Sequence, residues 1–314
     1  MSHKKPKIGF IGSGNVGASA AMICAEKELG DCVLFDVAGD VAAGKALDMY
    51  QTGPVLSYDT RVTGSKDPAI LADCDVVIIT AGLARKPGMT REDLQKVNAG
   101  ILKSCGENLV RFAPDCVAIV VTNPLDIMTY HLLKVTGFPK ERVVGQAGIL
   151  DTARFRTFLA AELGVSVKDV QAMVLGGHGD TMVPVLDYTT VSGIPIREFI
   201  RLGITTEEKL KAIVQRTADG GAEIVKLLGT GSAYYAPGAA AALMAESILR
   251  DQKRVVPCSC YLEGEYGING IYSGVPAILG RKGVEKVIEV KLSPSDLASL
   301  QKSANFYKEQ AALL

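Results

Sequence analysis

One histidine stands in a setting that suits acid–base chemistry. His178 follows an apolar segment and lies in the run GGHGD, from Gly176 to Asp180. An imidazole exchanges its proton near neutral pH, so it can act as acid and as base in a reversible reaction. The flanking glycines would allow a backbone and a bulky ligand to come close. A histidine that only occupies a glycine turn is the structural alternative. His3, near the amino terminus, and His131, inside a helical pattern, carry no such signal.

Two charged residues offer partners for this histidine. Asp151 and Arg154 are three positions apart in the segment LDTARF, so on a helix their side chains share a face. A local ion pair is the simpler interpretation. The functional interpretation is that Asp151 orients and charges His178, while Arg154 binds a substrate carboxylate through two parallel hydrogen bonds.

A basic loop and two amides add groups that could bind an anion or a cofactor. Arg85, Lys86 and Arg91 are crowded into one glycine- and proline-containing loop. This is either a solvated basic loop or a lid whose arginines close over an anionic substrate. Asn123 directly follows a buried apolar run, where an amide can hold a substrate or cofactor oxygen. Asn98, on the helix after the loop, is expected to point toward the cofactor.

The amino-terminal segment has the pattern of a dinucleotide-binding turn. An apolar run leads into Gly12, Gly14 and Gly17, spaced as G-x-G-x-x-G, and a helical stretch and a second apolar run ending in Asp36 follow. The glycines permit a sharp turn, close approach of a pyrophosphate and tight helix packing, and the helix start attracts phosphate. Asp36 would accept both ribose hydroxyls and repel a 2′-phosphate, which favours NAD over NADP. Flavin and S-adenosylmethionine are the rival ligands.

These residues fall on an alternation of apolar runs and helical segments. Up to residue 145 the pattern predicts an α/β fold with a doubly wound parallel (Rossmann) sheet. Beyond it, a helix around 152–163, alternating segments such as 182–191 and long helical stretches predict an α+β substrate domain. We therefore expect an NAD-binding domain at residues 1–145 and a catalytic domain at 146–314, with the site between them.

Composition excludes several classes of function. Hydrophobic residues make up 48% of the chain, charged residues 22%, and the formal net charge is zero, which argues against nucleic acid or an anionic membrane as partner. No apolar run reaches transmembrane length, and a signal peptide is not indicated because residues 12–15 interrupt the first apolar run. The seven cysteines, without a C-x-x-C pair, indicate reduced thiols in a reducing compartment. Cys258 and Cys260 could share a metal, but no further ligands surround them, so we expect none.

Taken together, several motifs resemble the lactate/malate dehydrogenase family, most closely its malate dehydrogenases of lactate-dehydrogenase type. The motifs are GSGNVG, VVIITAGLARKPGMTREDL, VTNPLD, GILDTARF and LGGHGD, and they are collinear over essentially the whole chain. The resemblance implies a cytoplasmic, NAD-dependent oxidoreductase of the tricarboxylic acid cycle that converts a 2-hydroxy acid to a 2-oxo acid. It implies a homotetramer, with a dimer as the alternative.

The resemblance also implies roles for individual residues. His178 would be the proton donor and acceptor, Asp151 its partner, and Arg154 the ligand of the C1 carboxylate. Arg91 would polarise the carbonyl, and Asn123 would bind substrate and cofactor. The remaining cofactor contacts would come from Gly12, Ser13, Gly14, Asn15, Val16, Gly17, Asp36, Asn98, Val121 and Thr122.

Arg85 decides the expected substrate. In the family, the matching position is Gln in typical lactate enzymes and Arg in malate enzymes. A poorly solvated site must neutralise the second carboxylate of (S)-malate or oxaloacetate, and a bidentate arginine does so. Pyruvate would leave Arg85 buried and unpaired. We therefore predict a dicarboxylate substrate. The alternatives are an L-lactate or other 2-hydroxy acid dehydrogenase and, from another class, a non-catalytic NAD-binding protein. Gln146, where Met is common, and Lys86 depart from the family pattern.

Overall fold

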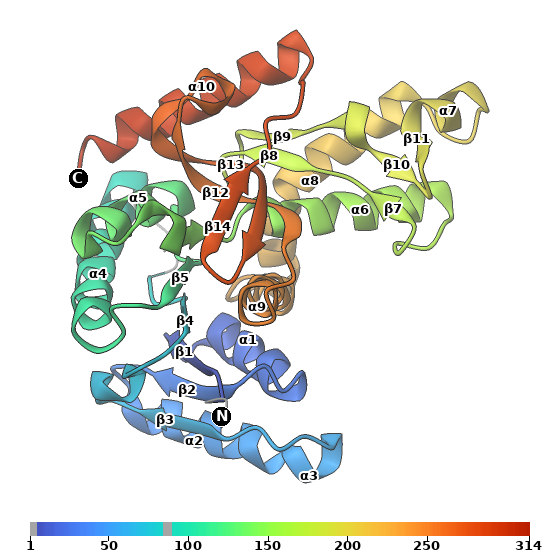
Figure 1. Ribbon diagram of the computed structural model, residues 1–314. Helices are drawn as coiled ribbons and strands as arrows, with labels where there is room; N and C mark the ends of the chain where they lie inside the picture. The colour runs from blue at the N-terminus through green and yellow to red at the C-terminus, as the bar shows by residue number, and fades with distance from the viewer. Residues whose placement is uncertain (1–4, 84–89) are drawn as a thin grey trace.

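The computed structural model describes residues 5–83 and 90–314, except for the side chain of Arg91 (Figure 1). A single sheet of 11 strands runs through the molecule in the order β3-β2-β1-β4-β5-β6-β12-β13-β8-β9, and β14 pairs with β13. Its parallel half consists of β1 (Lys7–Ile11), β2 (Asp31–Phe35), β3 (Val62–Ser65), β4 (Val76–Ile79), β5 (Val117–Val120) and β6 (Val143–Gly145).

The parallel half has the strand order of a doubly wound dinucleotide fold, which confirms the predicted fold class. β4 and β5 are buried at every position, as expected when helices cover both faces of a sheet. In Figure 1, α4 and α5 lie on one side of these strands and α1 and α9 on the other. The helices that follow the parallel strands are α1 (Asn15–Glu26), α2 (Gly39–Gln51), α3 (Gly53–Leu56), α4 (Arg91–Phe112) and α5 (Leu125–Thr136).

The carboxyl-terminal half continues the same sheet with antiparallel strands. These are β8 (Val174–Gly176), β9 (Met182–Pro184), β12 (Arg254–Glu263), β13 (Asn269–Gly280) and β14 (Gly283–Val287). The two halves join where Gly145 of β6 pairs with Ser259 of β12. A Cβ atom added to Gly145 would lie 2.8 Å from the Cβ of Ser259, so only glycine lets the two strands approach here.

A lobe with its own small core projects from this body (right side of Figure 1). Its strands form a three-stranded sheet, and its buried side chains include Phe155, Leu159 and Phe199. The lobe is built from α6 (Gly148–Leu163), β7 (Val170–Gln171), β10 (Thr190–Val191), β11 (Ile194–Pro195), α7 (Ile196–Arg201) and α8 (Glu207–Leu228). The remaining helices are α9 (Tyr235–Leu249) and α10 (Pro294–Ala311), and α10 packs on β13 and α5.

Two expected boundaries were wrong. Arg91, which the sequence placed in the basic loop, is the first residue of α4, because Thr90 accepts a hydrogen bond from Asp93 N at 3.0 Å and caps the helix. α6 begins at Gly148 rather than at 152, since this glycine packs against β8, where a Cβ would lie 2.5 Å from Val174 O. Residues 182–191 contain two strands of antiparallel pairs, as their alternating pattern predicts: β9 pairs with β8, and β10 pairs with β11 in the other sheet. β9 ends at Pro184, Val185 N still donates to Met173 O at 2.9 Å, and a 3₁₀ turn then leads to β10 in the other sheet.

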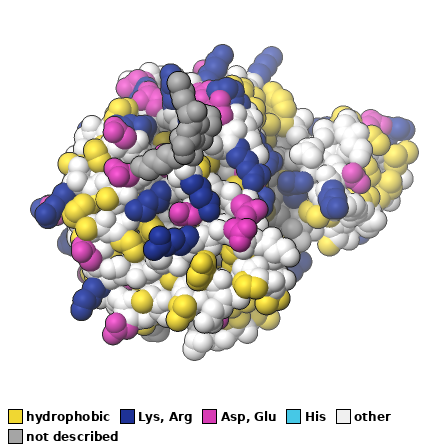
Figure 2. Space-filling model, turned by 60° about the horizontal axis from the view of Figure 1, so that its bottom comes forward, with side chains coloured by type: hydrophobic (Ala, Val, Ile, Leu, Met, Phe, Trp, Pro, Cys, Tyr) yellow, Lys and Arg dark blue, Asp and Glu magenta, His cyan; other side chains and the backbone are white. Residues whose placement is uncertain are grey.

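The structure shows how charged side chains are distributed on the surface and how the cysteines are placed. On the face shown in Figure 2, Lys and Arg side chains are interspersed with Asp and Glu. Within the described residues, no helix is both long and apolar enough to cross a bilayer. All seven cysteines belong to the described part, where they are buried and form no disulfide. The Sγ atoms of Cys258 and Cys260 lie 3.7 Å apart, and no group of three or more possible metal ligands occurs among the described residues.

Candidate active site

The predicted site residues that the structure describes gather at the carboxyl ends of the parallel strands. This is the edge at which open α/β sheets bind their ligands. A larger cavity, of about 850 Å³, lies at the opposite edge, near the starts of β4, β5 and β6, and its lining mixes acids such as Asp75 with bases such as Arg142. We place the site at the carboxyl edge because the glycine turn, the histidine and the strand-end amide converge there.

The glycine turn has the geometry that the sequence predicted. Gly12 has a φ of +100°, and a Cβ there would lie 2.7 Å from Ala81 N. At Gly17 a Cβ would lie 2.0 Å from Gly12 O, so this glycine lets α1 pack onto the turn. Nothing lies within 4 Å of the position of a Cβ on Gly14. The first turn of α1, from Asn15 and Val16, therefore presents its backbone N–H groups beside an open surface.

Asp36 is held at the end of β2 by the same turn. Its Oδ2 accepts hydrogen bonds from Ser13 N at 2.7 Å and Ser13 Oγ at 2.9 Å, and its Oδ1 accepts one from Ala38 N at 3.0 Å. Partial burial alone would raise the pKa of Asp36, but the Ala38 and Ser13 hydrogen bonds outweigh it and lower the pKa. The carboxylate is therefore anionic and fixed in orientation. Lys45 adds a nearby cation that donates to Ser13 O at 2.7 Å.

Asn98 lies deeper than the sequence suggested. It is 1% exposed, and its Oδ1 accepts from Leu83 N at 2.7 Å while its Nδ2 donates to Asn123 O at 2.7 Å. The amide thus braces the turn after β4 against the turn after β5, so it can act on a cofactor through the backbone it holds. Thr122 is also buried, with its hydroxyl donating to Ala81 O at 2.7 Å. Val121 lies beside it and Asn123 is exposed.

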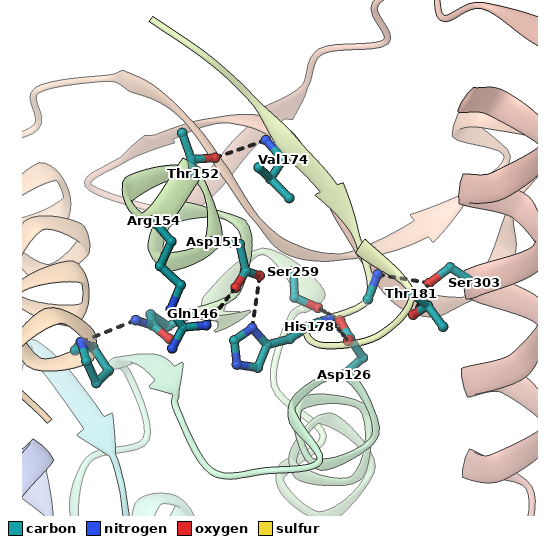
Figure 3. Close-up of polar contacts among 12 residues, drawn as sticks. Asp126, Gln146, Asp151, Thr152, Arg154, Val174, His178, Thr181, Ser259 and Ser303 are labelled. Carbon is teal, nitrogen blue, oxygen red and sulfur yellow. Dashed lines mark hydrogen bonds and ion pairs between the residues drawn. The ribbon is translucent and has the colours of Figure 1, made fainter. Parts of the chain in front are cut away.

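The structure brings His178, Asp151 and Arg154 together, as the sequence predicted (Figure 3). His178 Nδ1 lies 2.9 Å from Asp151 Oδ2, and Arg154 Nη1 lies 3.4 Å from Asp151 Oδ1. The Asp151 side chain is 2% exposed and that of His178 is 16% exposed. The α6 helix is tied to β8 close by, since Val174 N donates to Thr152 Oγ1 at 3.0 Å. The hydrogen bond at Nδ1 leaves Nε2 as the ring nitrogen that can exchange a proton with a ligand.

Electrostatics favour the protonated histidine. Burial alone would lower the pKa of His178, but the charge of Asp151 and its hydrogen bond outweigh burial and raise the pKa above its ordinary value. Arg154 acts in the opposite direction. The pairing with Asp151 therefore favours the protonated imidazole, which can release its proton to a suitable acceptor.

Within the described part of the chain, Arg154 has a hydrogen-bond donor that is not used. Its Nε is buried and has no hydrogen-bond partner among the described residues. Its side chain lies along α8, where the missing side chains of two glycines leave room: a Cβ on Gly220 would lie 3.1 Å from Arg154 Cδ, and one on Gly221 would lie 3.7 Å from Nη2. A buried guanidinium with a vacant donor suits an incoming carboxylate.

The glycines around the histidine differ from the expectation in one respect. Space beside Gly177 is filled by the protein itself, because a Cβ there would lie 1.9 Å from Tyr307 Cε2. Tyr307 OH donates to His178 O at 3.1 Å, and Ser303 Oγ accepts from Gly177 N at 2.9 Å. The C-terminal helix α10 therefore fixes the histidine turn. Only at Gly179, with a φ of +114° and nothing within 4 Å of a Cβ, is the surface open.

The sequence analysis missed one buried residue of the site. Asp126 is fully buried, and its carboxylate accepts hydrogen bonds from Ser259 Oγ at 2.6 Å and His178 N at 3.2 Å. The available signal was a lone acid at the start of the otherwise apolar helical run LDIM, directly after the strand-end turn.

His178 and Asn123 border one cavity of about 440 Å³. Its lining includes Pro124 and Ile127 of the α5 region and Phe306 and Tyr307 of α10. A cavity of this size suits a small organic ligand.

Part of the predicted site lies outside the described residues. Arg85 and Lys86 belong to the undescribed segment 84–89, and the side chain of Arg91 is likewise outside the description. Their expected roles in substrate binding and carbonyl polarisation remain predictions from the sequence.

Comparison with known proteins gives consistent results. Residues 6–145 match the model of the lactate/malate dehydrogenase NAD-binding domain, and residues 149–312 match that of the family's alpha/beta C-terminal domain. A malate dehydrogenase of Roseiflexus castenholzii is 56% identical over 310 residues, which is 99% of each chain.

Solved structures agree. The malate dehydrogenase of Cryptosporidium parvum is 42% identical with a TM-score of 0.96, over 99% of this chain and 100% of that one. The lactate dehydrogenase of the same organism, solved with lactic acid and nicotinamide adenine dinucleotide, is also 42% identical with a TM-score of 0.96, over 99% and 98%. The amino-terminal half of the chain is an NAD-binding domain, and the chain belongs to the lactate/malate dehydrogenase family.

Proposed function

We propose that the chain is an NAD-dependent malate dehydrogenase that reversibly oxidises (S)-malate to oxaloacetate. The observation that carries the proposal is the 2.9 Å hydrogen bond between Asp151 and His178, at the carboxyl edge of the sheet. It supplies a charged, oriented proton carrier on the same edge as the NAD-binding turn. A dehydrogenation that removes a hydride from carbon must also remove a proton from the attached oxygen, and His178 is placed to do so.

The residues divide the work as follows. The glycine turn and Asp36 would hold the cofactor, which as NAD would accept the hydride from C2 and as NADH would supply it. His178 gives its proton from Nε2 to the oxygen at C2 during reduction and takes it back from the malate hydroxyl during oxidation, while Asp151 stabilises the imidazolium. Arg154 holds the C1 carboxylate through its vacant donor. Asn123, exposed in the shared cavity, binds the substrate oxygen and the cofactor.

Arg85 and Arg91 complete the proposed site. Arg91 stabilises the negative charge that develops on the carbonyl oxygen. Arg85 pairs with the second carboxylate, an interaction of about 1.5–3 kcal/mol for each charged hydrogen bond. Substrate choice rests on this residue, since a malate and a lactate dehydrogenase resemble the present fold equally, each with a TM-score of 0.96. The 56% identity to a malate dehydrogenase favours the dicarboxylate.

One assay tests the proposal and its two alternatives. NADH absorbance is followed with oxaloacetate and with pyruvate, and both are repeated with NADPH. We expect the highest kcat/KM with oxaloacetate and NADH. A higher value with pyruvate would make the protein a lactate dehydrogenase, and no turnover with either acid would favour a non-catalytic NAD-binding protein.

A variant tests the proton carrier separately. His178→Asn should bind NADH with unchanged affinity, measured by fluorescence, yet lose turnover by a factor of about 10²–10⁴. His131→Asn is the matched control, because His131 lies on α5, is half-buried and belongs to no proposed step. Full activity of His178→Asn would exclude the role assigned to this residue.

Further expectations concern the protein in the cell. We propose a cytoplasmic homotetramer, with a dimer as the alternative, and a division into domains at residues 145 and 146. Light scattering measures the assembly. Limited proteolysis near the proposed boundary, followed by NADH-binding measurements on the fragments, tests the division.

A further inference from the structure

Asp126 lies where the two halves of the site meet. It is the second residue of α5, three positions after Asn123, and it is fully buried. Figure 3 shows its carboxylate between Ser259 of β12 and the backbone of His178. Asn123 comes from the NAD-binding half and His178 from the other half, so one short helical turn connects a proposed substrate ligand to the proposed proton carrier.

The carboxylate uses each oxygen for a different element. Oδ1 accepts from Ser259 Oγ at 2.6 Å, and Oδ2 accepts from His178 N at 3.2 Å. Asp151 holds the ring of His178 through Nδ1, whereas Asp126 holds its main chain. The histidine is therefore fixed at two points by two acids from different helices.

We propose that Asp126 is a positioning residue of the reaction: it fixes the main chain of His178, and its negative charge adds to that of Asp151 in stabilising the protonated imidazole. This inference rests on the proposed function only in taking His178 as the proton carrier. The effect of the Asp126 charge on the pKa of His178 can be measured whether or not the protein turns over a substrate.

The surroundings explain why a charge matters at this position. A fully buried carboxylate is unfavourable unless it is well hydrogen-bonded, and a neutral amide could also accept one of these bonds. Burial raises the pKa of Asp126 to about 6, while the hydrogen bonds from Ser259 and from His178 N work in the opposite direction. These hydrogen bonds and the charge of the protonated His178 favour the anionic form of Asp126, in a setting where charges interact strongly.

Among the described residues, two charged groups act on this carboxylate: His178, on the turn after β8, favours the anion, and Asp151 of α6 opposes it. Arg154 of α6 acts on His178 in the sense opposite to both acids. Removal of the Asp126 charge should therefore lower the pKa of His178, because one of the two anions that stabilise the imidazolium is lost.

The test measures that pKa directly. The chain has only three histidines, so NMR titration of the imidazole signals of the full-length protein, assigned with His178→Asn, gives the pKa of His178 without an assay. Asp126→Asn keeps the shape and removes the charge. We expect the pKa of His178 to fall by roughly 0.5–1 pH unit. In the oxaloacetate reaction, the basic limb of kcat/KM should move to lower pH by the same amount, with NADH affinity unchanged.

Two serine variants give a graded comparison. Ser259→Ala keeps the carboxyl group of Asp126 but removes a hydrogen bond that favours its anion. The negative charge is weakened and not abolished, so we expect the pKa of His178 to fall by less than in Asp126→Asn. Ser273→Ala is the matched control, because Ser273 lies buried on the neighbouring strand β13 and its hydroxyl has no partner among the described residues. Ser273→Ala should leave the pKa of His178 as in the parent.

The outcomes separate the two levels of inference. The proposal for Asp126 is wrong if Asp126→Asn and Ser259→Ala both leave the pKa of His178 within roughly 0.2 pH unit of its value in Ser273→Ala. Should Asp126→Asn fail to fold, as judged by circular dichroism, the Ser259→Ala titration decides. If the two variants show the expected pKa shifts but the parent protein does not reduce oxaloacetate, the proposed function fails while the positioning role of Asp126 stands.

Discussion

A single oxygen of Asp36 accepts two hydrogen bonds from Ser13, one from the backbone N at 2.7 Å and one from the hydroxyl at 2.9 Å. The glycine turn and the acid at the end of β2 are therefore one rigid unit. A carboxylate locked in this way can recognise ribose hydroxyls without reorganising.

Cofactor choice should follow from this carboxylate. Asp36→Asn keeps the shape but removes the charge that repels a 2′-phosphate, so we expect the ratio of kcat/KM for NADH over NADPH to fall at least tenfold, about 1.4 kcal/mol. Asp40→Asn, at an exposed acid in the first turn of α2, is the control and should leave the ratio unchanged. An unchanged ratio in Asp36→Asn would mean that other groups select the cofactor.

Substrate choice should follow from Arg85. In Arg85→Gln the second carboxylate of oxaloacetate loses its charged partner, and we expect kcat/KM for oxaloacetate to fall by roughly 10–150-fold. The value for pyruvate should rise, because no unpaired guanidinium then remains. Lys86→Gln removes the neighbouring cation and should shift the ratio less. Equal oxaloacetate-to-pyruvate ratios in Arg85→Gln and the parent would show that this side chain does not set specificity.

The pH dependence of reduction should depend on Asp151. Reduction needs protonated His178, so kcat/KM falls as the pH rises through the pKa of His178. Asp151 raises that pKa against the effect of burial. Asp151→Asn should therefore move the falling limb to lower pH and reduce kcat/KM at pH 7 by about 10²–10⁴. Asp187→Asn, at an exposed acid paired with Arg197, serves as control, and a pH profile of Asp151→Asn that matches this control would contradict the pairing.

One glycine of α8 should trade stability against substrate binding. In Gly220→Ala the new methyl would lie 3.1 Å from Arg154 Cδ, so the guanidinium must shift and the KM for oxaloacetate should rise severalfold or more. Alanine favours the helix by roughly 0.8–1 kcal/mol over glycine, so the melting temperature should hold or rise. Gly100→Ala in α4, where an added Cβ meets nothing within 4 Å, should gain the same stability with an unchanged KM. A lower melting temperature together with an unchanged KM in Gly220→Ala would contradict the proposed packing.

The parts of the molecule that the sequence predicts well are those encoded over short spans. The glycine turn, the buried runs of β4 and β5 and the Asp151–Arg154 pair all depend on neighbours within one or two turns of chain. The start of α6 predicted from the sequence was too late, because Gly148 is a poor helix former, and its place in the helix depends on its close packing against β8.

The remaining features depend on contacts between distant residues. Tyr307 fills the space beside Gly177 from a helix more than a hundred positions away, and Ser259 reaches Asp126 across 133 positions. Such pairs leave no periodic trace in the sequence. Asp126 was visible only as an unexplained acid in an apolar run, and its meaning came from the strand and the turn that surround it.

Because Gly145 pairs with Ser259, one continuous sheet connects β1, which leads into the glycine turn, with β8, which leads into the turn that carries His178. The distance between the glycine turn and the histidine turn is therefore set by the spacing of neighbouring strands, about 4.8 Å per strand, and not by a flexible linker. Surface loops in either half can change in length during evolution without changing this distance.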